Sequence, residues 1–359
     1  MPSSILPKAL KPGQTIAWIS PSARINDVYP AVMTRATAIL TSKGYKVREL
    51  YTLDKGIQNG IANRLSELRT ALTDPSIDAV FCTVGGPSFT ELLPALLADT
   101  ALHAAVRAHP KIVVGYSDIT GLHWFLHAVA GLRTFYGPCA IPELGDVGSI
   151  EDEDSPLAFC ARNLFRTLTD TAPLGDLERS RFFIPGVPPS LVPGKEEAAS
   201  EVLPSAGWTW IRPGKGEGRL FGGCLTVMAR LAGVRAIAPD WRGRVVFLET
   251  AVGEDKVSGN PISRVQAGIA DLIAQGVFDD AQGLVVGRPF GYHTPELREQ
   301  YINVIKGLLC EGPLGEKKFP ILYNIDIGHS SPLLTLPLDA LVSLDSDKDQ
   351  FAVLESAVA

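Results

Sequence analysis

The chain has 359 residues, of which 46% are hydrophobic and 20% are charged, a composition typical of a globular protein with room for two domains. A formal net charge of −6 argues against a nucleic-acid backbone as the main partner. The first residues, Met-Pro-Ser-Ser-Ile-Leu-Pro-Lys, lack the apolar core of a signal peptide, and no run of about 18 apolar residues predicts a membrane span. The five cysteines are scattered without a Cys-x-x-Cys pair, which favours reduced thiols in a cytoplasmic protein over a disulfide framework or a zinc site.

Strand-like and helix-like segments alternate over residues 1–140. Strands are predicted at 15–19, 46–50, 79–84 and 112–114, and helices at 28–43, 64–72, 90–97, 101–108 and around His123. This alternation predicts a parallel sheet with helices on both faces. Ligands of such sheets lie beyond the carboxyl ends of the strands. Gly85-Gly86 and Ser117 both fall at strand ends, so we expect them to converge on one crevice.

The alternation breaks between about residues 145 and 219. An acidic run at 151–154 precedes a predicted helix at 157–168, and a proline-rich passage covers 185–204. We therefore expect an N-terminal domain over 1–165, then a linker and a C-terminal domain over 166–359. Within the second domain, strands are predicted at 245–248, 284–286, 321–327 and 340–344, and helices at 265–274 and 295–309.

Ser117 is the most informative residue of the chain. It lies between the apolar strand 112–114, which Gly115 allows to turn sharply, and a helix that begins near Asp118. Such a serine presents its hydroxyl at the top of the sheet, while the amide of Asp118 is free at the positive end of a helix. This arrangement places a nucleophile beside an oxyanion donor. The alternative is a helix-capping serine, because the second glycine of Gly-x-Ser-x-Gly is missing.

A serine nucleophile needs a base, and the base needs an acid that orients it. His329 lies in a loop that follows a predicted strand, where binding residues concentrate. Glu249 closes the apolar strand Arg244-Val-Val-Phe-Leu-Glu249. Taken singly, Glu249 is equally well explained as a strand end at the surface, and His329 as a hydrogen-bonded loop histidine.

Other motifs are weaker candidates for chemistry. His123 and His127 have the spacing of a zinc-binding pair on a helix, but Trp124 stands where His-Glu-x-x-His requires glutamate. Two satisfied histidines on a buried helix are the better interpretation. Gly85-Gly86 begins neither a phosphate loop nor a dinucleotide fingerprint. An oxyanion loop fits it better, because a glycine amide can approach a substrate closely.

Taken together, these segments resemble the LD-carboxypeptidase family of serine peptidases, and most closely its microcin C self-immunity branch. The matching motifs occur in family order: Thr15-Ile-Ala-Trp-Ile-Ser-Pro-Ser22, Thr83-Val-Gly-Gly86 with Leu92-Leu-Pro94, Gly115-Tyr-Ser-Asp-Ile-Thr120, Gly218-Arg-Leu-Phe-Gly-Gly223, Phe247-Leu-Glu249, and Gly328-His329 with Pro332. The Gly-Gly loop lacks the arginine and tyrosine of the muropeptide enzymes. A Trp-x-Trp before Gly218 and the segment Gly-His-x-x-Pro-x-Leu-Thr-Leu-Pro also match the immunity branch.

The resemblance implies an α/β fold, with an N-terminal Rossmann-like parallel-sheet domain, a smaller C-terminal α/β domain and the active site between them. It also implies a triad of Ser117 as nucleophile, His329 as general base and Glu249 as the residue that orients it. The amides of Gly86 and Asp118 would form the oxyanion hole. Homodimers, no cofactor and no metal are expected from the same source.

Two positions depart from the family pattern and put the substrate in doubt. Cys224 replaces an asparagine that commonly touches substrate, and Gly253 stands where the immunity branch carries a lysine. Loss of polar partners changes the specificity of a site strongly. We expect substrate contacts from Gly85, Ser88, Trp208, Trp210 and Cys224. The tryptophans are placed to stack on a planar group of the substrate, although core or interface positions explain them equally well.

The sequence thus predicts a cytoplasmic serine hydrolase that cleaves an amide or peptide bond through an acyl-enzyme. The expected partner is a small molecule or a short peptide: a peptide tail, a modified amino acid or an aminoacyl-nucleotide conjugate. The alternatives are a muropeptide LD-carboxypeptidase and a binding protein that kept the fold and lost turnover.

Overall fold

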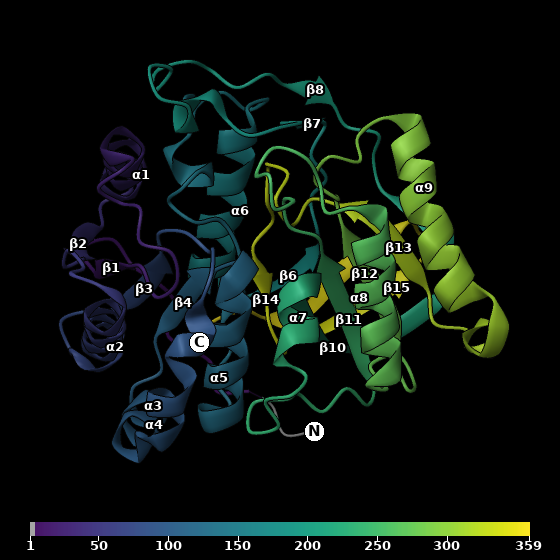
Figure 1. Cartoon of the computed structure of the whole chain (residues 1–359), viewed down its shortest axis with the longest axis horizontal. Coiled ribbons are helices and arrows are strands. Elements are labelled where there is room, and N and C mark those ends of the chain that lie inside the picture. Colours follow the sequence, from purple (N-terminus) through teal and green to yellow (C-terminus); the bar gives the residue numbers. More distant parts are fainter. Residues whose placement is uncertain (1–3) are drawn as a thin grey trace.

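The computed structural model describes residues 4–359, which form two sheets flanked by helices (Figure 1). The N-terminal sheet has the order β14-β5-β4-β3-β1-β2. Neighbouring strands from β5 to β2 are parallel, and β14 is antiparallel to β5. Its strands are β1 (Thr15–Ile19), β2 (Lys46–Leu50), β3 (Ala79–Cys82), β4 (Ile112–Gly115), β5 (Phe135–Tyr136) and β14 (Leu336–Pro337). The strand order 2-1-3-4-5 is that of a doubly wound sheet, which confirms the predicted Rossmann-like domain.

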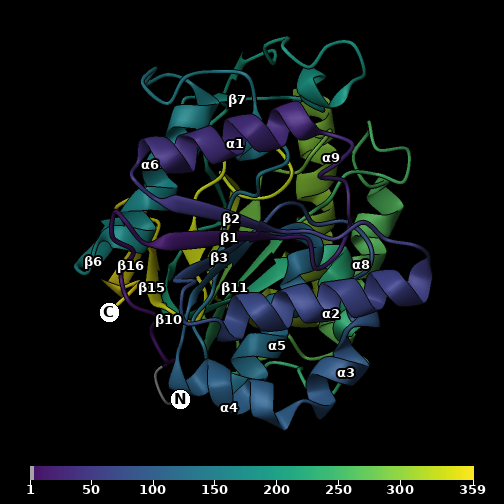
Figure 2. The ribbon, with the colours of Figure 1, turned by 90° about the vertical axis from the view of Figure 1, so that its left-hand side faces the viewer.

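Helices cover both faces of this sheet. Figure 2 shows α1 and α2 on opposite sides of β1, β2 and β3. The helices of this half are α1 (Pro30–Ser42), α2 (Ile57–Thr73), α3 (Leu93–Ala98), α4 (Thr100–Ala108), α5 (Thr120–Ala130) and α6 (Pro156–Thr169). Helix α2 begins at Ile57, earlier than the predicted residue 64. The sequence pattern does not reveal its first turns, because they are mostly exposed and carry no apolar periodicity.

The C-terminal sheet has the order β6-β16-β15-β10-β11-β12-β13-β9. Its central strands β10 to β13 are parallel, and antiparallel strands lie on both sides of them. The strands are β6 (Pro173–Asp176), β9 (Thr209–Arg212), β10 (Lys215–Cys224), β11 (Arg244–Glu249), β12 (Gly283–Gly287), β13 (Ile321–Ile325), β15 (Leu341–Asp345) and β16 (Gln350–Ser356). A separate hairpin pairs β7 (Phe182–Phe183) with β8 (Leu203–Pro204).

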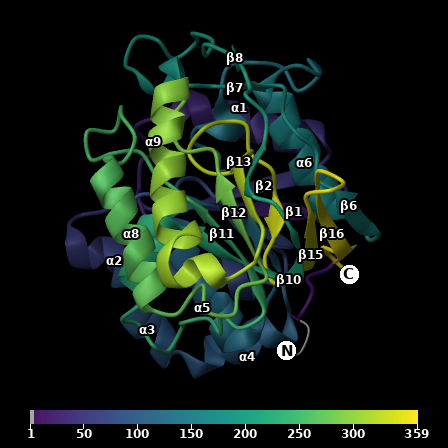
Figure 3. The same ribbon diagram turned by 90° about the vertical axis from the view of Figure 1, so that its right-hand side faces the viewer.

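The helices of this half are α7 (Leu225–Leu231), α8 (Ile262–Ala274) and α9 (Pro295–Ile305), and the last continues as a π-helical turn to Cys310. Figure 3 shows α8 and α9 side by side over the strands β11 to β13. Among residues 4–359, no helix has the length and apolar character needed to cross a membrane.

Two features join the halves. Strand β14 lies within the predicted C-terminal domain but pairs with β5 of the N-terminal sheet, so the chain returns to its first half near its end. The indole of Trp124 on α5 donates a hydrogen bond to the carbonyl of Gly222 on β10 at 3.0 Å, inside the core. These contacts join the sheet that contains β4 to the sheet that contains β11 and β13.

Candidate active site

Ser117 lies in a sharp turn between β4 and α5. Its φ is +64°, a left-handed conformation that non-glycine residues adopt rarely and that is common at functional turns. A short 3-10 turn over Ser117–Ile119 leads directly into α5. The residue is half-buried. The backbone therefore has the strand–turn–helix form expected of a nucleophile elbow.

Three side chains that are far apart in the sequence form a continuous hydrogen-bonded chain. The hydroxyl Oγ of Ser117 lies 2.9 Å from Nε2 of His329, and Nδ1 of His329 lies 2.8 Å from Oε2 of Glu249. The Glu249 side chain is fully buried, whereas 11% of the His329 side chain is exposed. The histidine is thus held from behind by a carboxylate and faces the serine in front, the geometry of a hydrolase triad.

Glu249 and His329 shift each other's ionisation. Burial raises the pKa of Glu249, but the charge of His329 and hydrogen bonds from His329, Tyr136 and Cys224 outweigh it, so the pKa is lowered overall. Burial lowers the pKa of His329, but the charge and hydrogen bond of Glu249 raise it above the ordinary 6.5. An anionic carboxylate beside a more basic imidazole suits a general base.

Tyr136 connects the serine turn to the carboxylate. Its hydroxyl accepts a hydrogen bond from the backbone N–H of Ser117 at 3.0 Å and donates one to Oε1 of Glu249 at 2.7 Å. The ring is fully buried and packs edge-on against Phe247, with centroids 5.0 Å apart. The hydroxyl therefore ties the backbone of one half to a side chain of the other. Sequence analysis missed this residue, although its position at the end of β5, beside β4, was a usable signal.

A second buried carboxyl group, that of Glu143, is linked to His329 through Tyr116. The Glu143 carboxylate accepts a hydrogen bond from the Tyr116 hydroxyl at 2.7 Å, and the Tyr116 ring stands edge-on to His329 with centroids 5.0 Å apart. Burial raises the pKa of Glu143 to about 7, against the opposing effect of hydrogen bonds from Tyr116 and the Cys139 amide. The surroundings of His329 thus contain two acidic groups whose pKa values are shifted in opposite directions, downward for Glu249 and upward for Glu143.

Glycines allow the backbone to approach these side chains. A Cβ on Gly85 would lie 2.6 Å from Cβ and 2.9 Å from Oγ of Ser117. Gly86 has φ +91°, and a Cβ there would lie 2.5 Å from that of Ala23. Gly328 has φ +103°, and its Cβ would lie 2.8 Å from Oε2 of Glu249. The loop after β3 can therefore touch the serine, and the loop after β13 can deliver His329, only with glycine at these positions.

The Asp118 side chain fastens the serine turn to its surroundings. Its carboxylate accepts hydrogen bonds from the Ser22 hydroxyl and the Phe89 amide, each at 2.6 Å, and pairs with Arg230 of α7. Ser22 follows β1, Phe89 follows the Gly85-Gly86 loop, and Arg230 comes from the other half of the chain. Sequence analysis assigned only the amide of Asp118 a role, and the carboxylate's partners come from non-local contacts.

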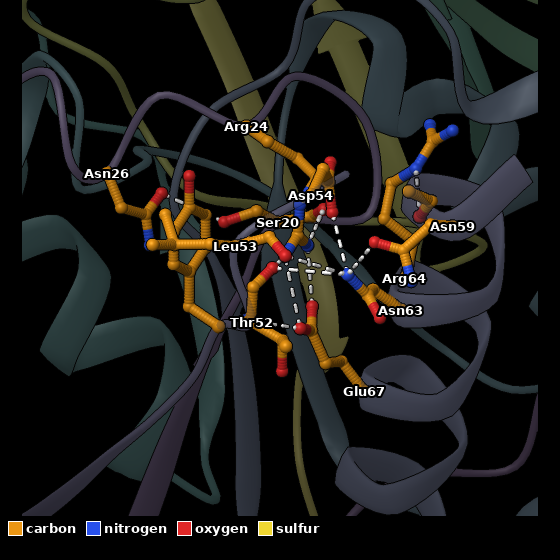
Figure 4. Close-up of polar contacts among 12 residues, drawn as sticks. Ser20, Arg24, Asn26, Thr52, Leu53, Asp54, Asn59, Asn63, Arg64 and Glu67 are labelled. Atoms are coloured by element: carbon orange, nitrogen blue, oxygen red, sulfur yellow. Dashed lines mark hydrogen bonds and ion pairs between the residues drawn. The ribbon is translucent and has the colours of Figure 1, made fainter. Parts of the chain in front are cut away.

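A further polar network fixes the loops after β1 and β2 (Figure 4). Arg24 pairs with Glu67 of α2 at 2.6 Å and lies 3.0 Å from Asp54, which also accepts a hydrogen bond from Asn63. Arg64 of α2 donates to the carbonyl of Ser88 at 3.3 Å and pairs with Glu91. Helix α2 thereby anchors the segment that follows the Gly85-Gly86 loop.

The predicted substrate-binding residues are distributed unevenly. Gly85 and Ser88 belong to the loop beside Ser117. Cys224 is adjacent to Glu249 across β10 and β11 but is buried, with its amide bonded to the Thr120 hydroxyl at 3.0 Å. These contacts give Cys224 a structural position, since it exposes almost no surface to a ligand.

Trp208 and Trp210 lie around β9, at the edge of the C-terminal sheet. The Trp208 indole donates to Asp326 at 2.9 Å and lies under Arg179, and the Trp210 indole donates to Asp349 at 2.8 Å. Trp208 is also part of the apolar core. These contacts do not support the predicted stacking platform, because the rings are engaged by their own domain.

The His123 ring of α5 packs beside Tyr136, with ring centroids 5.9 Å apart. The ring nitrogens of His123 contact the Thr134 hydroxyl and the Gly115 carbonyl, each at 2.9 Å, as expected of a satisfied buried histidine. His127 differs, since its buried Nδ1 has no hydrogen-bond partner. Over residues 4–359, no three His, Cys, Asp or Glu side chains are grouped as a metal site would require. All five cysteines are unpaired.

Comparison with known proteins gives matches along almost the whole chain. Residues 16–137 match the LD-carboxypeptidase N-terminal domain, and residues 217–344 match the LD-carboxypeptidase C-terminal domain. The chain is 27% identical to the microcin C7 self-immunity protein of Escherichia coli, covering 98% of this chain and 96% of that protein. It is 27% identical to a Bacillus subtilis protein named as a murein peptide carboxypeptidase, covering 98% and 95%. The solved structure of the microcin C7 self-immunity protein with aspartyl sulfamoyl adenosine superimposes with a TM-score of 0.82 at 25% identity, covering 99% of this chain and all of that one.

Proposed function

The chain belongs to the LD-carboxypeptidase family of serine peptidases, and from this premise we propose that Ser117, His329 and Glu249 form its catalytic triad. The reaction proposed is hydrolysis of an amide or peptide bond through an acyl-enzyme. The observation that carries the proposal is the unbroken set of contacts from Ser117 Oγ to His329 at 2.9 Å and from His329 to Glu249 at 2.8 Å.

Each residue has one role in this mechanism. Ser117 Oγ attacks the carbonyl carbon of the substrate while His329 Nε2 takes the hydroxyl proton. Glu249 holds the ring with Nδ1–H directed at its own carboxylate and stabilises the imidazolium that forms. The histidine then gives the proton to the departing amine. Water, activated by the same histidine, releases the acyl group from Ser117 and restores the enzyme.

The amides of Gly86 and Asp118 are proposed to hold the oxyanion. The Asp118 amide begins a helical turn and has no intrahelical acceptor, and the conformation of Gly86 at φ +91° turns its peptide groups away from the regular strand. The Ser117 amide is not available for this role, because it donates to Tyr136. Preorganised amides of this kind supply much of the rate enhancement in acyl transfer.

The substrate is proposed to be a small peptide, a modified amino acid or an aminoacyl-nucleotide conjugate. Relatives named for murein peptides and for microcin C7 immunity, and a neighbour solved with aspartyl sulfamoyl adenosine, support this range. A muropeptide LD-carboxypeptidase is the alternative within hydrolases. A binding protein without turnover is disfavoured, because all three triad side chains are present and in contact. Cytoplasmic location, a homodimer and the domain limits 1–165 and 166–359 remain predictions that accompany this proposal.

Turnover of two substrate panels tests the proposal: aminoacyl sulfamoyl nucleosides and peptides with an L,D-bond. The wild type is expected to hydrolyse members of at least one panel, and Ser117→Ala to lose several orders of magnitude in kcat with an unchanged melting temperature. An alanine variant that folds normally and retains most of the activity would refute the role of Ser117.

A further inference from the structure

A cavity of about 400 Å³ lies at the carboxyl ends of β12 and β13. It is lined by Phe183, Arg288, Tyr292, His293, Arg298 and Asn324, among others. Arg288 follows β12, Arg298 belongs to α9, and Asn324 belongs to β13. No acidic side chain lines this cavity, which brings two guanidinium groups and an imidazole together.

The β7–β8 hairpin separates this cavity from one of opposite charge. Phe183 lines the arginine-lined cavity, whereas the residues before and after it in the chain, Phe182 and Ile184, line a second cavity of about 490 Å³. Successive side chains of a strand point to opposite faces, which explains the division. The second cavity carries three carboxylates and no lysine or arginine, namely Asp146, Asp152 and Asp154. A negatively charged ligand is therefore favoured on the Phe183 side only.

The hydrogen-bonding capacity of Arg288 is only partly used. It pairs with Asp326, and the same guanidinium nitrogen lies 3.3 Å from the Ser205 hydroxyl. Its other terminal nitrogen, Nη1, is buried and has no hydrogen-bond partner among the described residues 4–359. Asp326 is itself occupied by the Trp208 indole and the Ser180 amide. A buried guanidinium N–H without an acceptor is costly, so a ligand oxygen at this position would remove a penalty that the protein carries alone.

Arg298 supplies a charge that the protein does not neutralise. Within residues 4–359, no carboxylate lies within ion-pair distance of its guanidinium, and the side chain is half-buried. Burial raises the pKa of Tyr323, which precedes Asn324 on β13, and the positive charges of Arg298 and Arg288 oppose that rise. The Tyr323 hydroxyl also lacks a hydrogen-bond partner. With Arg288 paired to Asp326, the cavity keeps about one uncompensated positive charge.

Two strands that contribute to the cavity also lead to the proposed triad. Asn324 lies on β13, and the loop that carries His329 follows this strand. At the end of β12, a Cβ on Gly287 would lie 2.8 Å from that of Glu249. Arg288, which follows Gly287, and Asn324 therefore lie on or next to strands whose ends also position Glu249 and His329.

We propose that this cavity binds a carboxylate or phosphate group of the substrate, held between the guanidinium groups of Arg288 and Arg298. The planar fork of arginine matches the oxygens of either group. That the group belongs to the substrate rests on the proposed function, whereas anion binding itself does not. The substrates of this enzyme are accordingly expected to carry a negative charge at a distance from the scissile bond.

Calorimetric titration of the full-length Ser117→Ala protein tests the site without turnover. One arm compares adenosine 5′-monophosphate with adenosine, and the other compares an N-acetylated L,D-dipeptide acid with its C-terminal amide. Binding that depends on the phosphate identifies a nucleotide source, and binding that depends on the free carboxylate identifies a peptide source. Both results support the proposal. If neither anion binds better than its neutral counterpart, the proposal is wrong.

Two variants in the same Ser117→Ala background localise the binding. Arg298→Gln is expected to weaken the anionic probe at least about tenfold, the scale of a lost charged hydrogen bond, and to leave the neutral probe unchanged. Arg264→Gln, which removes an exposed charge from α8, is the matched control and is expected to bind as its parent does. Equal affinity in both variants would contradict the assignment, even if the wild type proves to be a Ser117-dependent hydrolase.

Discussion

At the scale of single residues, Tyr136 shows how the proposed mechanism depends on a group that does not touch the substrate. Its hydroxyl accepts from the Ser117 amide and donates to Glu249, so one oxygen sets both the angle of the serine turn and the position of the carboxylate. Removing it leaves a buried N–H and a carboxylate oxygen each short of a partner, at a cost of about 1–3 kcal/mol for each group.

We predict that Tyr136→Phe lowers kcat about tenfold or more and changes KM little, because the loss acts on the reacting groups rather than on substrate binding. Steady-state kinetics of the variant measures both constants. Tyr45→Phe makes the same chemical change in a buried ring stacked on Phe165, and it should behave like the wild type. A Tyr136→Phe enzyme with normal kcat would show that the bridging hydroxyl has no positioning role.

If His329 is the general base, as proposed, its ionisation sets the pH dependence of the reaction. The general base must be neutral, and Glu249 raises its pKa above 6.5, so kcat/KM should fall as pH decreases through a value above 6.5. Glu249→Gln removes the raising charge and should move this limb to lower pH while reducing the maximum rate. Burial raises the pKa of Glu143 to about 7, so this group could produce a limb in the same pH range. If His329 produces the limb, the limb persists in Glu143→Gln. If the limb disappears in Glu143→Gln, the group that titrates is Glu143 and not His329, and our assignment is wrong.

At the scale of elements, the site is an assembly of strand ends. Ser117 follows β4, Glu249 ends β11, and His329 follows β13. The Gly85-Gly86 loop after β3 closes against the serine because it has no side chain there. The site therefore depends on how the loops at these strand ends are placed relative to one another, and no single sequence motif contains it.

Gly85→Ala should therefore damage catalysis more than stability. Its Cβ would fall 2.6 Å from Cβ of Ser117, so the loop must move away and carry the Gly86 amide with it. We expect kcat to fall at least about tenfold, as for a displaced oxyanion donor, with a modest decrease in melting temperature. Gly233→Ala, where an added Cβ meets nothing within 4 Å, is the control. Equal activity of the two variants would mean that the Gly85 contact is dispensable.

Local patterns predicted the elements that have a regular apolar period or a clear turn. The strands β1 and β2 have the predicted bounds, and the β4–Ser117–α5 turn has the predicted form. The pairing of Ser117 with Glu249 and His329 followed only from family resemblance, because nothing local links residues so distant in the chain. Strand β14 is too short to carry a period. The positions of Trp208 and Trp210 could not be predicted either, because the hydrogen-bond partners of their indoles, Asp326 and Asp349, are far away in the sequence.

At the scale of the whole molecule, the two halves seen in Figure 1 are bound by more than a linker. Strand β14 adds to the edge of the N-terminal sheet beside β5, the Trp124 indole donates a hydrogen bond to Gly222, and Arg133 of the first half pairs with Glu355 near the end of the chain. The proposed triad is itself divided between the halves, because Ser117 follows β4 whereas Glu249 and His329 belong to the second half. Relative motion of the halves would therefore separate the serine from its base.

We predict that the halves unfold in one cooperative transition. Differential scanning calorimetry should give a single peak whose calorimetric and van't Hoff enthalpies agree. The reason is that β14 belongs to the second half of the chain but pairs with β5 of the N-terminal sheet. Unfolding of either half therefore breaks contacts of the other. Two resolved transitions, with activity lost in the first, would show that the halves are independent and that the site depends on a weak junction.

The central claim is that Ser117 is a nucleophile activated by His329 and Glu249. Reaction with a fluorophosphonate at pH 8, followed by peptide mass mapping, tests it most directly, because the reagent phosphonylates only an activated serine. We expect one adduct, on Ser117, absent in Ser117→Ala and strongly reduced in His329→Gln. An adduct on a different residue, or an enzyme that hydrolyses its substrate while Ser117 remains unmodified and replaceable, would contradict it.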